Sequence, residues 1–157
     1  MKELIASTLK GMGRKYASKD AVSLVWATGL VESNYKYIRQ IRGPARGFFQ
    51  IEPQTAASAV ENYFRYRKQL TTRSSLVSNT PGSLWGSADQ ERWDSVLESN
   101  IIAGIIHCRI KYWRAPEKMP SSIDGYAKYW TRHYNTIKGK GEVEGFLRKV
   151  EKYADFL

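Results

Sequence analysis

Apolar residues recur at helical spacing along most of the chain. The clearest series begins after Asp89, with apolar positions separated by four or three residues: Trp93, Leu97, Ile101, Ile105, Cys108 and Tyr112. Such spacing places the side chains on one face of a helix. Pro116 and Pro120 follow, and proline lacks the amide hydrogen that a helix interior requires. The pattern therefore predicts one long helix over residues 89–114.

Similar spacing predicts five further helices. They cover residues 4–17, 21–34, 55–70, 121–134 and 142–156. In the second of these, apolar residues predict a single buried stripe, and Ser18-Lys19-Asp20 is expected to supply the cap at its start. The Ser- and Thr-rich segment 71–86 is expected to be an exposed loop, and residues 48–51 a short strand or a buried loop. The sequence thus predicts a mainly α single domain over residues 1–157, with about six helices and at most one small β-hairpin.

Positive charge is the strongest feature of the composition. The chain has 25 Lys and Arg residues against 15 Asp and Glu, a formal net charge of +10. This excess favours a polyanionic partner, and nucleic acid, lipid headgroups and cell wall all fit. The single cysteine, Cys108, excludes an intrachain disulfide framework and a zinc site built from cysteines. His107 and His133 have no acidic partner at metal-ligand spacing, so neither a metal nor a cofactor is expected.

The chain has no segment that is expected to enter a membrane. Its longest apolar run, around Ile101 to Ile106, is much shorter than the roughly 18–20 residues that span a bilayer. The N-terminus contains an early acid, Glu3, and lacks the continuous apolar stretch of a signal peptide. These features predict a soluble, basic protein without a transmembrane segment.

Glu32 differs from the other acidic residues. Most acids have a basic neighbour three or four positions away on a predicted helix face, which is typical of a solvated surface. Glu32 ends a helix whose preceding turns are apolar and lies just before a glycine-containing irregular segment. Apolar surroundings disfavour an ionised carboxyl and raise its pKa, so that it can donate a proton near neutral pH. The competing interpretation is an ordinary ion pair with Arg39, Arg42 or Arg46.

The residues after Glu32 form an ordered set of motifs. Glu32-Ser33 is followed by Ala45-Arg46-Gly47-Phe48-Phe49-Gln50 and by Pro53-Gln54-Thr55-Ala56. Asn100-Ile101-Ile102-Ala103-Gly104 and Tyr134-Asn135 come later. In this order the motifs resemble those of soluble lytic transglycosylases, a family of the lysozyme-like superfamily. The segment 133–141 also resembles phage-encoded cell-wall lytic proteins. The resemblance covers residues 22–135 and implies a lysozyme-like fold.

The resemblance implies a role for each matched residue. Glu32 corresponds to the catalytic general acid and base, and the substrate-binding matches are Ser33, Gly47, Phe49, Gln50, Tyr134 and Asn135. Gly47 corresponds to a position where the backbone approaches the sugar, and Tyr134 to a tyrosine that hydrogen-bonds the catalytic carboxylate. The chain departs from the family pattern in three places: Pro44 replaces glycine, Phe48-Phe49 replaces Leu-Met, and Thr136-Ile137 replaces Ala-Gly.

The implied reaction is cleavage of the MurNAc–GlcNAc bond of peptidoglycan. Most glycosidases use two carboxyl groups, whereas no Asp or Glu lies between Glu32 and Gly47. A single acid suits lytic transglycosylation, in which the substrate's own 6-hydroxyl closes a 1,6-anhydro ring and no water is activated. The alternative is hydrolysis with Glu52 as the second acid. Glu52 is also suited to a purely structural role, as a negative charge at the start of a helix.

A basic stretch supports a different class of function. Residues 36–73 contain eight cations against two acids, Glu52 and Glu61. Within this stretch, Arg65, Arg67 and Lys68 alternate with aromatic residues, a combination that binds nucleic acids by stacking and charge. No known DNA-binding motif accompanies them, so nucleic acid is not the expected partner. A virion protein that has lost catalysis is a third hypothesis.

The expected partner is therefore the peptidoglycan glycan strand. Arg39, Arg42 and Arg46 are expected to border the glycan groove, where they would attract the anionic bacterial envelope. The resemblance to phage proteins implies a monomeric endolysin or virion-associated enzyme. Such a protein is made in the host cytoplasm or carried in the virion, and it acts on peptidoglycan in the periplasm or cell wall.

Overall fold

The structure is a computed structural model that describes residues 1–135 and 143–157, except for the side chain of Phe156. The described residues form eight α-helices: α1 (Lys2–Met12), α2 (Lys19–Ser33), α3 (Pro53–Asn62), α4 (Lys68–Ser78), α5 (Gln90–Ser99), α6 (Ile101–Trp113), α7 (Ile123–His133) and α8 (Val143–Val150). They also form four 3-10 helices: η1 (Arg14–Tyr16), η2 (Phe64–Tyr66), η3 (Gly82–Gly86) and η4 (Glu151–Phe156). Within these residues the only β-pairing is two isolated bridges, Arg39 with Arg46 and Arg46 with Ile51. The mainly α prediction is confirmed, with more helices than the expected six.

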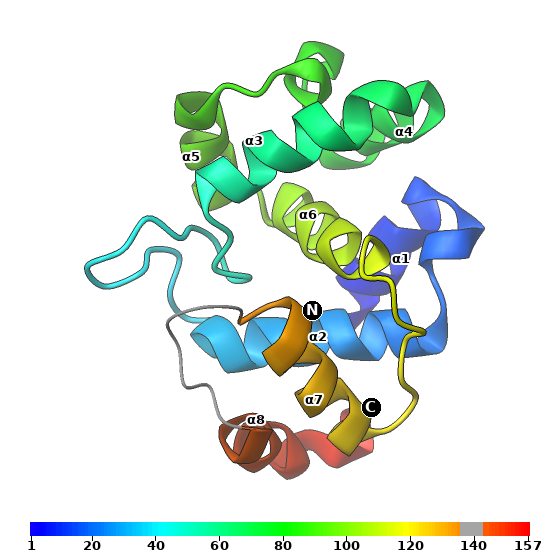
Figure 1. Cartoon of the computed structure of the whole chain (residues 1–157), viewed down its shortest axis with the longest axis vertical. Coiled ribbons are helices and arrows are strands. Elements are labelled where there is room, and N and C mark those ends of the chain that lie inside the picture. The colour runs from blue at the N-terminus through cyan, green and yellow to red at the C-terminus, as the bar shows by residue number, and fades with distance from the viewer. Residues whose placement is uncertain (136–142) are drawn as a thin grey trace.

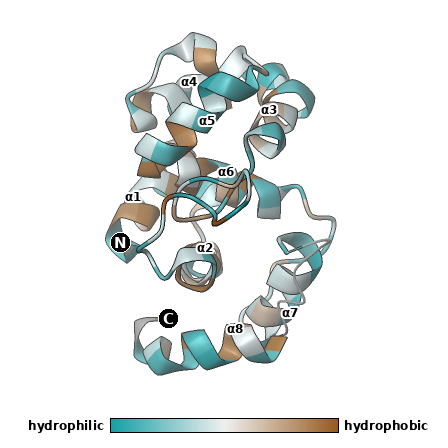
Figure 2. Ribbon diagram, turned by 90° about the vertical axis from the view of Figure 1, so that its left-hand side faces the viewer, coloured by the Kyte–Doolittle hydropathy of each residue, from teal (hydrophilic) through white to brown (hydrophobic). Residues whose placement is uncertain are grey.

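Helix α2 lies at the centre of the molecule. It packs against α1, α6 and α8, while α3–α5 lie toward one end of the molecule and α7–α8 toward the other (Figures 1 and 2). Every residue from Ala21 to Val31 is buried, so the predicted single stripe is wrong: this helix is covered on all sides. The cap was predicted correctly, because the Ser18 side chain accepts a hydrogen bond from the backbone N–H of Ala21 at 3.1 Å.

The long helix predicted over residues 89–114 is two helices. Asn100 has extended backbone angles between α5 and α6, and its side chain accepts a hydrogen bond from the N–H of Ala103 at 2.9 Å. The same side chain donates to the carbonyl of Ser78 at 2.9 Å. The break turns Ile101 outward, with 39% of its surface exposed, whereas Leu97 and Ile105 remain buried.

The segment predicted as an exposed loop, 71–86, is mostly helical. Helix α3 ends at Asn62 instead of continuing to residue 70, and α4 and η3 follow. Ser74 and Ser78 are buried in α4, where the hydroxyl of Ser78 donates to the carbonyl of Ser74 at 2.6 Å. Serine composition was misleading here because this hydroxyl obtains its hydrogen bond inside the helix.

A single hydrophobic cluster takes residues from all eight helices. Its aromatic part surrounds His107, which stacks on Trp85 with ring centroids 5.4 Å apart and meets Trp93 edge-on at 4.5 Å. His107 Nε2 is buried without a hydrogen-bond partner among the described residues. None of the helices described is both long and apolar enough to cross a bilayer.

Candidate active site

Glu32 lies in the last turn of α2 and is partly buried. Its Oε1 atom accepts a hydrogen bond from the indole N–H of Trp130, on α7, at 2.8 Å. Burial raises the pKa of Glu32 above its ordinary value, although the Trp130 hydrogen bond and the nearby charges of Lys111 and Lys149 act in the opposite direction. None of the ion pairs in the described residues includes Glu32. The competing interpretation, an ion pair of Glu32 with Arg39, Arg42 or Arg46, is therefore wrong.

The two lysines near Glu32 are held by backbone carbonyls. Lys111, on α6, donates to the carbonyl of Tyr134 at 2.9 Å, and Lys149, on α8, donates to the carbonyl of Val31 at 2.6 Å. Each ammonium is thereby placed near the carboxyl without forming an ion pair with it. Burial also lowers the pKa of Lys111, while Glu32 and Glu52 both act to raise it. Lys111 is thus within electrostatic reach of both acids.

Ser33 fastens the end of α2 to the irregular segment that follows. Its hydroxyl is 2.8 Å from the carbonyl of Phe48 and accepts the backbone N–H of Tyr35 at 3.1 Å. Asn34, in the left-handed region with φ 53°, ends the helix. The Ser33 side chain is buried, and these contacts fix the end of α2 next to Glu32.

No hydrogen bond joins Tyr134 to Glu32 in the described structure. Its hydroxyl donates to the carbonyl of Phe49 at 2.7 Å, and Trp130 makes the hydrogen bond that was expected of Tyr134. The sequence analysis missed Trp130. Trp130 lies four residues before Tyr134, and residues with this spacing lie on the same face of a helix. The adjacent Asn135 is partly buried, and its backbone N–H donates to the carbonyl of Trp130 at 3.1 Å.

The ring of Phe49 belongs to the core, so its expected contact with a glycan is not supported. Only 1% of Phe49 is exposed, and its carbonyl is the acceptor for Tyr134. Gly104 makes room for this ring, since a Cβ at that position would lie 3.2 Å from it. Part of the Asn-Ile-x-x-Gly match therefore has a packing explanation: Asn100 caps α6, and Gly104 allows Phe49 to pack beneath it.

Gly47 also has a structural explanation. Its φ is +69°, and a Cβ would lie 2.5 Å from the backbone carbonyl oxygen of Leu97, on α5. Close approach to α5 thus requires glycine independently of any sugar. Gln50 has a positive φ of 47°, and its side-chain amide donates to the carbonyl of Gly47 at 2.8 Å.

We expect Gly47→Ala to lower the free energy of unfolding by about 1–3 kcal/mol, because it adds both backbone strain and a steric clash. Urea denaturation measures this loss. Gly86→Ala is the matched control, since nothing lies within 4 Å of a Cβ there. Normal stability with lost lysis in Gly47→Ala would instead assign Gly47 to sugar contact.

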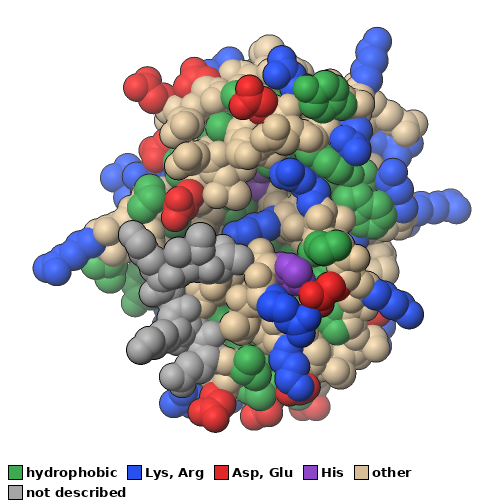
Figure 3. Space-filling view, in the orientation of Figure 1, with side chains coloured by type: hydrophobic (Ala, Val, Ile, Leu, Met, Phe, Trp, Pro, Cys, Tyr) green, Lys and Arg blue, Asp and Glu red, His purple; other side chains and the backbone are tan. Residues whose placement is uncertain are grey.

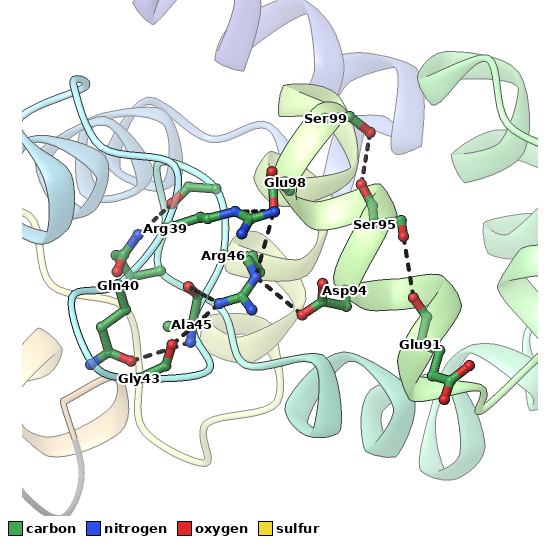
Figure 4. A network of polar contacts seen from close by, with 12 residues as sticks. Arg39, Gln40, Gly43, Ala45, Arg46, Glu91, Asp94, Ser95, Glu98 and Ser99 are labelled. Carbon is green, nitrogen blue, oxygen red and sulfur yellow. Dashed lines mark hydrogen bonds and ion pairs between the residues drawn. The ribbon is translucent and has the colours of Figure 1, made fainter.

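Ion pairs fasten the segment 39–51 to α5 (Figure 4). Arg39 Nε lies 2.8 Å from Glu98 Oε2, and Arg46 Nε lies 3.1 Å from Asp94 Oδ1. Arg46 also donates to the carbonyl of Ala45 at 3.1 Å. Two of the three cations expected to border a glycan groove therefore have acidic partners, which weakens their attraction for a distant anion.

Glu52 is the N-cap residue of α3, is exposed, and makes no side-chain cap hydrogen bond. The described residues contain no group of three His, Cys, Asp or Glu side chains that could hold a metal ion. Two motif segments, Thr136-Ile137 and Gly139–Gly141, lie outside the described residues, as does the expected helix start at Glu142. No family model, curated protein or solved structure matches the chain.

Proposed function

We propose that the protein cleaves the MurNAc–GlcNAc bond of peptidoglycan by lytic transglycosylation, with Glu32 as the general acid and base. The observation that carries the proposal is a carboxyl at a helix end, partly buried, outside any described ion pair, with a pKa raised by burial. A general acid needs this property, because it must keep its proton at the pH of the reaction. The motif resemblance around Glu32 supports the choice of substrate.

The proposed chemistry requires one proton to leave Glu32 and one to return. Trp130 donates to Oε1, which leaves Oε2 to carry the proton. Protonated Glu32 gives this proton to the glycosidic oxygen as the bond between that oxygen and C1 of MurNAc breaks. The carboxylate then accepts the proton of the muramyl 6-hydroxyl as O6 bonds to C1. No water is consumed, and the new end is a 1,6-anhydro sugar.

A hydrolytic muramidase is the second candidate. It is favoured by the position of Lys111, which is within electrostatic reach of both Glu32 and Glu52. In this alternative, Glu52, an exposed acid at the start of α3, would activate the attacking water. A second carboxylate in this role is the usual arrangement in glycosidases.

Product analysis separates the two reactions. Purified peptidoglycan is digested in water enriched in oxygen-18, and the fragments are examined by mass spectrometry. We expect anhydro-muramyl ends, each lighter by one water than a reducing end and free of the heavy isotope. Reducing ends that carry oxygen-18 would reject transglycosylation and assign hydrolysis. Absence of any cleavage would reject both.

The nucleic-acid hypothesis loses support from the positions of its aromatic residues. The ring of Phe64 is buried and packs against Trp85 and His107. Arg67 covers the ring of Tyr63, with its guanidinium carbon 3.6 Å from the ring centroid. Only Tyr66 among the three proposed rings is largely exposed, at 72%. The stacking surface that the hypothesis needs is therefore reduced to one ring.

A further inference from the structure

A basic site, separate from the candidate active site, lies between the end of α1 and the start of α4. A pocket of about 290 Å³ is lined there by Lys15, Arg67, Lys68 and Arg73, over Met12 and Leu70. The lining contains no acidic residue, and none of the four cations forms an ion pair among the described residues. Lys and Arg side chains gather over this region along the right-hand edge of Figure 3. The pocket therefore concentrates positive charge without internal compensation.

Backbone carbonyls hold the two guanidinium groups in place. Arg67 donates to the carbonyl of Tyr63 at 3.0 Å, and Arg73 donates to the carbonyl of Met12 at 3.4 Å. Gly13 permits the second contact, because a Cβ there would lie 2.7 Å from Arg73 Nη1. Each guanidinium has five N–H donors, so these backbone contacts leave further donors at the pocket. Their fixed positions reduce the entropy lost when a ligand binds.

The two lysines lack any such hydrogen bond in the described residues. Lys15 Nζ lies 5.2 Å from the ring centroid of Tyr16, and no hydrogen bond of the Lys68 ammonium is found among the described residues. The start of α4 adds to the positive potential, because its N-cap residue, Arg67, makes no side-chain cap. Uncapped N–H groups and the helix dipole both favour an anion at this end. Four like charges and a helix N-terminus thus share one pocket.

We propose that this pocket binds a compact phosphate anion, such as a phosphomonoester or inorganic pyrophosphate. Phosphate fits because it accepts several hydrogen bonds at once and carries enough charge to offset neighbouring cations. The donors converge on one cavity, whereas an extended nucleic acid needs a track of cations and exposed rings. Lys15 precedes the start of α2 and Glu32 lies in its last turn, so most of this helix, about 20 Å long, lies between them along the chain. The proposal does not rest on the proposed catalytic function.

The test is calorimetric titration of the whole protein with inorganic pyrophosphate at low salt. We expect measurable binding by the unmodified protein and an affinity at least about tenfold lower in the double variant Lys15→Gln, Lys68→Gln, which loses two charge-assisted contacts. The matched control is Lys118→Gln, Lys152→Gln, which removes the same charge from exposed lysines outside the pocket. Its affinity should change less than twofold.

Three results would overturn the proposal. The first is the absence of pyrophosphate binding by the unmodified protein, a measurement that needs no variant. The second is equal weakening in both double variants, which would show a net-charge effect. The third is binding of duplex DNA that depends on Lys15 and Lys68 without binding of pyrophosphate. Thermal denaturation of each variant verifies folding, and peptidoglycan digestion is measured separately, so failure here leaves the proposed catalytic function untouched.

Discussion

Glu32→Gln is expected to reduce peptidoglycan cleavage by about 10²- to 10⁴-fold while the protein remains folded. Glutamine has nearly the same shape and can still accept the hydrogen bond of Trp130 through its amide oxygen, but it has no proton to give. Release of soluble muropeptides measures the loss. Glu61→Gln is the control, since Glu61 is an exposed acid on α3. Retained cleavage by Glu32→Gln would remove the basis for the proposed mechanism.

The same variant is expected to be more stable than the unmodified protein at neutral pH. Burial raises the pKa of Glu32, so the folded state opposes its ionisation. Below the ordinary pKa of a carboxyl, Glu32 is neutral in both the folded and unfolded states and the two proteins have similar stability. As the pH rises through the raised value, the unmodified protein must ionise a partly buried carboxyl and loses stability. The gain for Glu32→Gln should be about 0.5–2 kcal/mol.

Urea unfolding at pH 4 and pH 8 tests this expectation. The stability difference between Glu32→Gln and the unmodified protein should appear only at the higher pH. Glu61→Gln should show no comparable difference at either pH. A Glu32→Gln protein that is less stable than the unmodified one at pH 8 would show that the carboxylate is favoured by its surroundings, contrary to the effect of burial.

The second large effect is expected at His107, which should make the protein sensitive to acid. Burial lowers the pKa of His107 to about 3, whereas an unfolded histidine titrates near 6.5. Stability is therefore complete above about pH 6.5 and falls as the pH decreases toward 3, because only the unfolded state accepts the proton. The loss is about 1.4 kcal/mol per pH unit in this window. Between pH 6.5 and 5 it amounts to about 2 kcal/mol.

His107→Leu should remove this part of the pH dependence. The imidazole Nε2 has no described hydrogen-bond partner, so replacement by leucine removes no observed hydrogen bond of that atom. Chemical denaturation at pH 7, 6 and 5 compares the slopes of stability against pH. His133→Leu removes the other histidine, which lies 3.6 Å from Glu117 and is partly exposed, and should keep the steep slope. Equal slopes for His107→Leu and the unmodified protein would contradict the prediction that the lowered pKa of His107 causes the acid sensitivity.

Sequence periodicity predicted the helical class, but it could not locate breaks or show that α2 is buried on every side. The apolar spacing continues through Ile101, and nothing in that spacing distinguishes a helix from two helices joined at Asn100. The helix breaks at Asn100 because the side chain of this residue caps α6. The same side chain also bonds to Ser78, which lies 22 positions earlier in the chain. Polar composition also misled at α4, where the hydroxyl of Ser78 donates to the carbonyl of Ser74 within the helix.

The candidate site was predicted in part. The expected apolar surroundings of Glu32 agree with its partial burial and raised pKa, because the preceding turns of its own helix are buried, while its catalytic role stays a prediction. Its partner Trp130 is 98 positions away, and local spacing carries no information about such a contact. Three of the motif residues assigned to substrate instead make contacts that stabilise the site: Ser33 and Tyr134 bond to carbonyls of the segment 39–51, and Phe49 packs in the core.

The complete enclosure of α2 has a consequence for the motion of the proposed catalytic group. A helix surrounded on every side exposes its amide hydrogens to exchange with solvent only when the whole molecule opens. Glu32 lies in the last turn of this helix, and the next residue, Ser33, fastens the helix end to Phe48 and Tyr35. The backbone that carries the Glu32 carboxyl is therefore expected to keep its position for as long as this protected helix stays folded. If a glycan strand binds, the surrounding side chains and loops are expected to move, and the backbone of α2 is not.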